Sequence, residues 1–154
     1  MKKIIFLFAT ILLLSTSCTR QKYQAALLAT MNEINKECPM YIDEVTTCSG
    51  TDYSIGSPYF TYNYTIDEDV CPMSLIVYAI DEIAQNVKSS IVSITTEDFL
   101  EACIKADVMI RFQYTGNTSG EWCSVIYNPT TEETETVTES ESDSWSDILE
   151  EYGL

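Results

Sequence analysis

The sequence predicts an α+β fold: a four-stranded antiparallel sheet of two β-hairpins, with helices on one face. Two pairs of short segments alternate apolar and polar residues around glycine-containing turns, and other segments place apolar residues at helical spacing. These segments follow one another in the order α-β-β-α-α-β-β. Because each helix has one apolar stripe and the sheet one apolar face, packing all helices on a single face is the simplest arrangement.

The first helix is predicted over residues 19–37. Its apolar residues recur at helical spacing: Tyr23, Ala26, Leu27, Met31 and Ile34. Cys38-Pro39 ends this helix, because the residue before a proline is pushed out of the helical region of backbone space.

The first hairpin is predicted from residues 45–55 and 59–66, which flank Gly56-Ser57-Pro58. Successive side chains of a strand point to opposite faces, so one face of the second strand carries Phe60, Tyr62, Tyr64 and Ile66. We predict that this face is buried in the core, and an aromatic platform for carbohydrate is the alternative. Ahead of the hairpin, Asp43 is expected to hold backbone amides in a turn near Thr46.

Two further helices are predicted between the hairpins. Acidic residues 67–69 and Cys71-Pro72 favour a helix start, and the apolar period then continues from Pro72 to about Lys88. A short apolar link, residues 91–94, follows. Thr95 or Thr96 is expected to cap the next helix, over residues 97–105.

Residues 107–115 and 121–128 form the second predicted hairpin, around a turn at 116–120. We expect residues 18–128 to make a single α+β domain, followed by an acidic, disordered tail over residues 129–154. Thr130 to Asp143 is nearly all Thr, Glu and Ser, which is typical of a linker.

Within the tail, residues 145–152 have the spacing of a short amphipathic helix. Its apolar residues lie at i, i+3, i+4 and i+7: Trp145, Ile148, Leu149 and Tyr152. This segment is predicted to dock on a protein partner. Docking on the open sheet of its own domain and a frayed tail are the alternatives.

The first 17 residues have the features of an export signal. Lys2 and Lys3 precede an apolar run of eleven residues, Ile4 to Leu14, and three small residues lead to Cys18. As a helix this run rises about 16 Å, roughly half the hydrocarbon thickness of a bilayer, which favours a cleaved signal over a permanent span.

The Leu-Ser-Thr-Ser-Cys sequence that ends at Cys18 resembles the lipobox of bacterial lipoproteins. The resemblance implies that Cys18 carries a diacylglycerol and further acyl chains, palmitate among them. It therefore implies a protein anchored in the cell envelope, facing the periplasm or the cell exterior. Ordinary signal-peptidase cleavage, with Cys18 as a thiol, is the alternative.

The charge of the chain excludes one class of partner. The formal net charge is −16, and removing Lys2 and Lys3 with the signal makes it −18. Nucleic acid is bound by Lys and Arg that displace counterions, so this chain is not expected to bind it. Anionic lipid head groups would also repel the protein, so the acyl chains of Cys18 must supply the contact with the bilayer.

Five cysteines follow Cys18, and an odd number leaves at least one unpaired: Cys38, Cys48, Cys71, Cys103 and Cys123. We predict that Cys38 and Cys71 lie close together, as a candidate disulfide, because each precedes a proline at a helix boundary. The chain has no histidine and no Cys-x-x-Cys pair, which argues against zinc. No metal and no cofactor are expected.

A second resemblance involves the segment Cys38-Pro39-Met40-Tyr41-Ile42-Asp43-Glu44-Val45-Thr46 and the later Tyr62-Asn63-Tyr64-Thr65. These residues resemble a group of small uncharacterised exported bacterial proteins, in which a Pro-x-x-x-Asp-x-x-Thr segment precedes a Tyr-x-Tyr strand. The resemblance supports the fold and implies no activity.

The absence of histidine closes the Cys-His and Ser-His schemes of nucleophilic catalysis. Carboxylate pairs such as Asp81 with Glu82 are explained by a solvated helix face. The sequence therefore predicts a membrane-anchored lipoprotein that is not an enzyme, acting as a binding or envelope-structural module. An inhibitor of an enzyme, or an enzyme that uses carboxylates, is the alternative.

Overall fold

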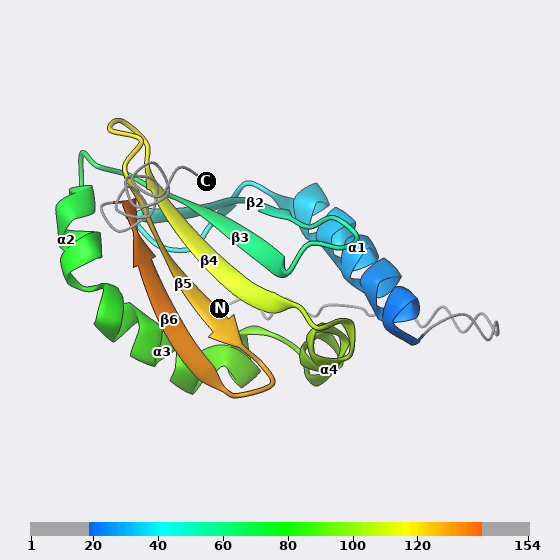
Figure 1. Cartoon of the computed structure of the whole chain (residues 1–154). Helices are drawn as coiled ribbons and strands as arrows, with labels where there is room; N and C mark the ends of the chain where they lie inside the picture. Colours follow the sequence, from blue (N-terminus) through cyan, green and yellow to red (C-terminus); the bar gives the residue numbers. More distant parts are fainter. Residues whose placement is uncertain (1–18, 140–154) are drawn as a thin grey trace, which may run out of the picture.

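The computed structural model describes residues 19–139. Four helices and six strands alternate in blocks along the chain (Figure 1): α1 (Thr19–Glu37), β1 (Met40–Tyr41), β2 (Thr46–Asp52), β3 (Tyr59–Ile66), α2 (Met73–Tyr78), α3 (Ile80–Ile94), α4 (Glu97–Ala106), β4 (Met109–Gly116), β5 (Trp122–Asn128) and β6 (Glu133–Thr138). The predicted α+β class is confirmed, and the expected sheet of four antiparallel strands is wrong.

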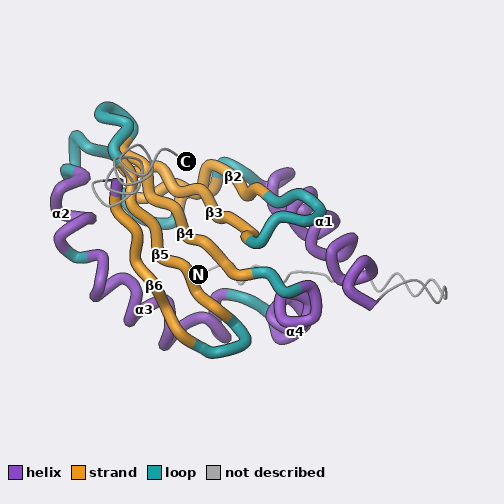
Figure 2. Tube along the Cα trace, in the orientation of Figure 1, coloured by secondary structure: helices purple, strands orange, loops and turns teal. Residues whose placement is uncertain are grey.

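The six strands form one sheet in the order β1-β2-β3-β4-β5-β6 (Figure 2). All neighbours are antiparallel except the central pair, β3 and β4, which run parallel with Tyr59 beside Met109 and Ile66 beside Gly116. The reason is the connection between them. Residues 67–108, which include three helices, lead the chain from the end of β3 back to the end of the sheet where β3 starts. Because β4 then begins beside the start of β3, the two strands run parallel, and parallel neighbours require a long crossover of this kind.

The last strand, β6, lies where the sequence predicted a linker. Residues 133–138 pair antiparallel with β5, with Val125 opposite Thr136. Thr is a good strand former, and the strand is held by backbone hydrogen bonds to β5 more than by burial of its own side chains. The ordered domain therefore extends beyond the predicted boundary at residue 128.

The helices follow the apolar pattern, with one interruption. α1 ends at Glu37 as predicted, whereas the single helix expected from Pro72 is divided at Ala79 into α2 and α3. The expected link at 91–94 belongs to α3, because Ile91 continues its buried stripe. Thr96 caps α4 by accepting a hydrogen bond from the backbone of Phe99. None of the helices in the described part of the chain has the length and apolarity needed to cross a bilayer.

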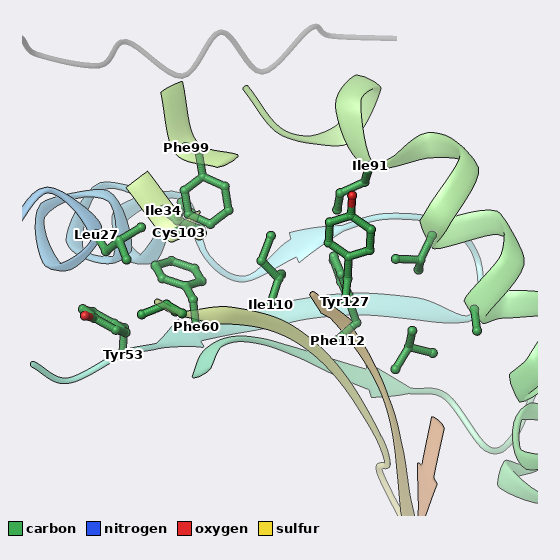
Figure 3. Close-up of a cluster of buried hydrophobic side chains, with 14 of the residues drawn as sticks. Leu27, Ile34, Tyr53, Phe60, Ile91, Phe99, Cys103, Ile110, Phe112 and Tyr127 are labelled. Atoms are coloured by element: carbon green, nitrogen blue, oxygen red, sulfur yellow. The ribbon is translucent and has the colours of Figure 1, made fainter. Parts of the chain in front are cut away.

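The core lies between the sheet and the helices, which all pack on one of its faces (Figure 3). The predicted core face of β3 is confirmed: Phe60 and Ile66 are buried, and Tyr62 and Tyr64 pack against the same cluster. Tyr62 stacks on Phe112 of β4 with ring centroids 5.4 Å apart. This aromatic row faces the helices, so the idea of a carbohydrate platform there is wrong.

Candidate functional site

The sheet has a second face that none of the described helices covers, here called the open face (Figures 1 and 2). By strand alternation, its residues on β3, β4 and β5 are those pointing away from the core: Tyr59, Thr61, Asn63, Thr65, Met109, Arg111, Gln113, Thr115, Trp122, Ser124, Ile126 and Asn128. The strand register sets Asn63, Gln113 and Ser124 side by side in one row. The neighbouring row contains Thr61, Arg111 and Ile126.

Two residues of the open face are buried although no described helix covers them. Ser124 is 2% exposed and Ile126 is 6% exposed, and Ile126 lies outside the hydrophobic cluster of the core. Their neighbours across the strands are the long side chains of Arg111 and Gln113. The middle of the open face is therefore a packed surface of polar and apolar groups.

Arg111 is the only basic residue in the six strands. Its guanidinium lies over the ring of Tyr59, 3.9 Å from the ring centroid. Within residues 19–139 its Nε atom is buried and has no hydrogen-bond partner. A guanidinium stacked in this way is held in place while its remaining N–H groups can donate to carbonyl or carboxylate oxygens.

The cysteines of the core are not suited to nucleophilic chemistry. Burial raises the pKa of the Cys103 thiol to about 12 and that of the Cys123 thiol to about 11. Both thiols are protonated at neutral pH, and the thiolate is the reactive form. Among residues 19–139, no three His, Cys, Asp or Glu side chains are grouped so that they could hold a metal ion.

The two cysteines predicted to lie together are both half-buried and free. The Cys48 thiol, on β2, donates to the backbone carbonyl of Gly50, 3.9 Å away. Cys71 forms its hydrogen bond with the carbonyl of the adjacent Pro72. All five cysteines within residues 19–139 are free, so the structure records no bridge between Cys38 and Cys71.

The predicted role of Asp43 is confirmed. Its Oδ1 atom accepts hydrogen bonds from the backbone of Val45, at 2.8 Å, and of Thr46, at 2.7 Å. Asp43 therefore organises the turn between β1 and β2. Its partners are two and three residues further along the chain, so the local sequence pattern was enough to predict this interaction.

Glu68, one of the acidic residues 67–69, makes a long-range contact that the sequence did not predict. Glu68 Oε2 accepts hydrogen bonds from the backbone of Thr118, at 2.8 Å, and of Ser119, at 2.7 Å. These bonds favour the carboxylate and lower the pKa of Glu68. Its partners lie about fifty residues further along the chain, so no local pattern could reveal the pairing.

The remaining predicted site residues lie outside the described residues. They are the lipidation site, Cys18, and the docking segment in the tail: Trp145, Ile148, Leu149 and Tyr152.

The fold defines the class of this protein: an α+β domain with a mixed six-stranded sheet and helices on one face. No protein-family model matches the chain, and no curated protein matches it. Among solved structures it is similar to a crystal structure from Pseudomonas aeruginosa described as a "putative secreted protein", with a TM-score of 0.56 and 10% identity. The match covers 82% of this chain and 97% of that one. At this identity the similarity shows the fold alone.

Proposed function

We propose that this protein is an exported lipoprotein, held in the cell envelope by acylated Cys18, and that it is a binding module without catalytic activity. The sequence of residues 1–18 supports the anchor. The observation that connects anchor and domain is that α1 already includes Thr19, the residue next to Cys18. With so short a connection, the domain would lie directly against the bilayer. The Pseudomonas protein of similar fold is described as a "putative secreted protein", which agrees with export.

The open face supports the binding role. It presents hydroxyl and amide groups together with Arg111, and Tyr59 holds that guanidinium in place. Such groups match the carbonyl and carboxylate oxygens of a polypeptide. In a chain with a formal charge of −16, a single oriented guanidinium on a large polar face is the feature most suited to recognising a protein partner.

The anchor is tested by replacing Cys18 with serine. Wild-type protein in its native host should incorporate a radiolabelled or clickable palmitate and should partition with membranes. Cys18→Ser should lose the label and accumulate as an unprocessed or soluble form, while the control Cys71→Ser should behave as wild type. Equal labelling of Cys18→Ser and wild type would show that another residue, or none, carries the lipid.

The binding role is tested by site-specific photocrosslinking in cells. A photoreactive amino acid is placed at Gln113, on the open face, or at Gln85, which is exposed on α3. Gln113 should yield a discrete crosslinked species, identifiable by mass spectrometry, that Gln85 does not yield. The same species from both positions, or none from Gln113, would count against the open face as the binding surface. If the captured protein is an enzyme, its activity with and without this protein distinguishes an inhibitor from a structural partner.

A further inference from the structure

The two outer edges of the sheet are closed in different ways. At one edge β1 pairs with the start of β2, and further along β2 the side-chain amide of Asn35 bonds both backbone groups of Thr51. At the other edge β6 pairs with β5 over six consecutive residues, without a bulge. Among the described residues, no strand lies beyond β6. The first edge is therefore capped in part by a side chain, whereas the second ends in a regular strand.

The outer side of β6 has backbone groups available for pairing. In an antiparallel pair, every second residue turns its N–H and C=O away from the partner strand. Proteins often close such an edge with proline, lysine, a bulge or a covering segment. β6 consists of Glu, Thr and Val, and its pairing with β5 is continuous. Helix α3 packs on its core face, where Asp81 accepts a hydrogen bond from the Thr136 hydroxyl. Another extended chain can therefore pair with this edge.

The charges along β6 determine which chain can pair with it. The register with β5 places Glu133 and Glu135 on the open face, opposite Asn128 and Ile126, and both carboxylates are exposed. The two ion pairs of the described residues involve other side chains, so neither carboxylate is neutralised by a cation there. Like charges opposite each other destabilise paired strands, and opposite charges stabilise them. In a chain of formal charge −16, this edge repels a second copy of itself and favours a basic strand.

We propose that the outer edge of β6 binds an extended basic segment of another protein, which adds a seventh strand to the sheet. Backbone hydrogen bonds to residues 133–137 supply affinity, and lysine or arginine side chains lie beside Glu133 and Glu135. Because alternate side chains of a strand share a face, basic residues spaced two apart fit this edge. Figure 1 shows β6 on the side of the sheet away from α1. The inference depends on neither the anchor at Cys18 nor the partner of the open face.

The pairing is tested with a defined probe, a blocked peptide of alternating lysine and valine. The protein is the chain from residue 18 onward, with Cys18→Ser so that no lipid is attached. Calorimetry measures binding, and NMR measures hydrogen exchange at single amides. We expect the peptide to slow exchange several-fold at alternate amides within residues 133–137 and to leave the amides of β2 unchanged.

Two further peptides separate backbone pairing from charge. The lysine-valine peptide methylated at every backbone nitrogen keeps its charges and loses its N–H donors. It should bind several-fold more weakly and should protect no amide of β6. A peptide of alternating glutamate and valine keeps the donors and reverses the charge, and it should not bind. Equal binding of the methylated and unmethylated peptides would show that charge alone is recognised, and this would overturn the proposal.

Variants of the protein locate the site. Glu133→Gln together with Glu135→Gln should weaken binding of the lysine-valine peptide several-fold. The matched control, Glu44→Gln together with Glu121→Gln, changes the net charge equally at exposed positions elsewhere and should bind as wild type. Unchanged exchange at residues 133–137 in the presence of the peptide would overturn the proposal. A dimer in sedimentation equilibrium that protects these amides without peptide would also overturn it, because a second copy would then occupy the edge.

Discussion

The side-chain amide of Asn35, in the last turns of α1, takes the place of a strand beside Thr51 of β2. Asn35 Oδ1 accepts from the backbone N–H of Thr51 at 2.7 Å, and Asn35 Nδ2 donates to the Thr51 carbonyl at 2.9 Å. The Thr51 hydroxyl also donates to Asn35 Oδ1, at 3.0 Å. β1 pairs with β2 only as far as Cys48, so the amide satisfies backbone groups that the missing strand would otherwise bond.

Replacing Asn35 with alanine should destabilise the fold. Thr51 is buried, and its backbone groups would lose their partners, which costs about 1–3 kcal/mol in free energy of unfolding. Chemical denaturation measures the change. Asn86→Ala, on the exposed side of α3, is the matched control and should change stability by less than about 0.5 kcal/mol. Equal changes in the free energy of unfolding for the two substitutions would show that the Asn35 contact does not stabilise the fold.

Glu68 predicts a dependence of stability on pH. Its pKa in the folded state lies below the ordinary 4.5, so its contribution is present at neutral pH and is lost as the pH falls through the folded pKa. Glu68→Gln should lower the melting temperature at neutral pH, because a neutral amide accepts the Thr118 and Ser119 hydrogen bonds more weakly. The difference from wild type should shrink in acid. Glu121→Gln, in the same turn, serves as control and should show no such convergence.

Phe60 is the central aromatic residue of the core. It is fully buried and makes an edge contact with Phe99, with ring centroids 5.0 Å apart (Figure 3). Phe60→Ala should cost about 3–5 kcal/mol in free energy of unfolding, through lost burial and the cavity left behind. Val92→Ala, on the exposed face of α3, should change it by less than about 0.5 kcal/mol. Thermal and urea denaturation measure both, and a cost near 1 kcal/mol for Phe60→Ala would contradict this view of the core.

Arg111 should affect binding more than stability. Arg111→Ala is expected to reduce photocrosslinking from Gln113 several-fold, because it removes the oriented donors above Tyr59. Arg111→Lys should not restore the crosslink, since an ammonium lacks the planar fork and the stacking face of a guanidinium. The melting temperature of each variant separates loss of binding from loss of folding. Full crosslinking by Arg111→Ala would remove this residue from the proposed site.

The segment over residues 145–152 stays a prediction, because it lies outside the described residues. Replacing Trp145 and Leu149 together with alanine should abolish capture of a partner and leave the melting temperature unchanged. A lower melting temperature would instead indicate docking on the open face of the same domain. The control is the double substitution of Glu150 and Glu151 with alanine, which leaves the apolar stripe intact. No change in capture or stability would leave the segment without a role.

Patterns along the chain are sufficient to predict the features that depend on neighbouring residues. Four such features follow from patterns within a short stretch: the end of α1, a threonine cap (Thr95 or Thr96) before α4, the turn around Asp43 and the buried face of β3. Such features are decided by backbone geometry, hydrogen bonds across a few residues and the spacing of apolar side chains, all of which can be read along the chain.

The contacts between distant segments depend instead on how the whole chain packs. The parallel pairing of β3 with β4 depends on how the three intervening helices return the chain across the sheet. β6 consists of Thr, Glu and Val, and it becomes a strand because β5 supplies its hydrogen-bond partners. The contacts of Asn35 with Thr51 and of Glu68 with Ser119 likewise join segments that are far apart in the sequence. No local periodicity encodes these contacts, since each arises only when the packed core has brought its two elements together.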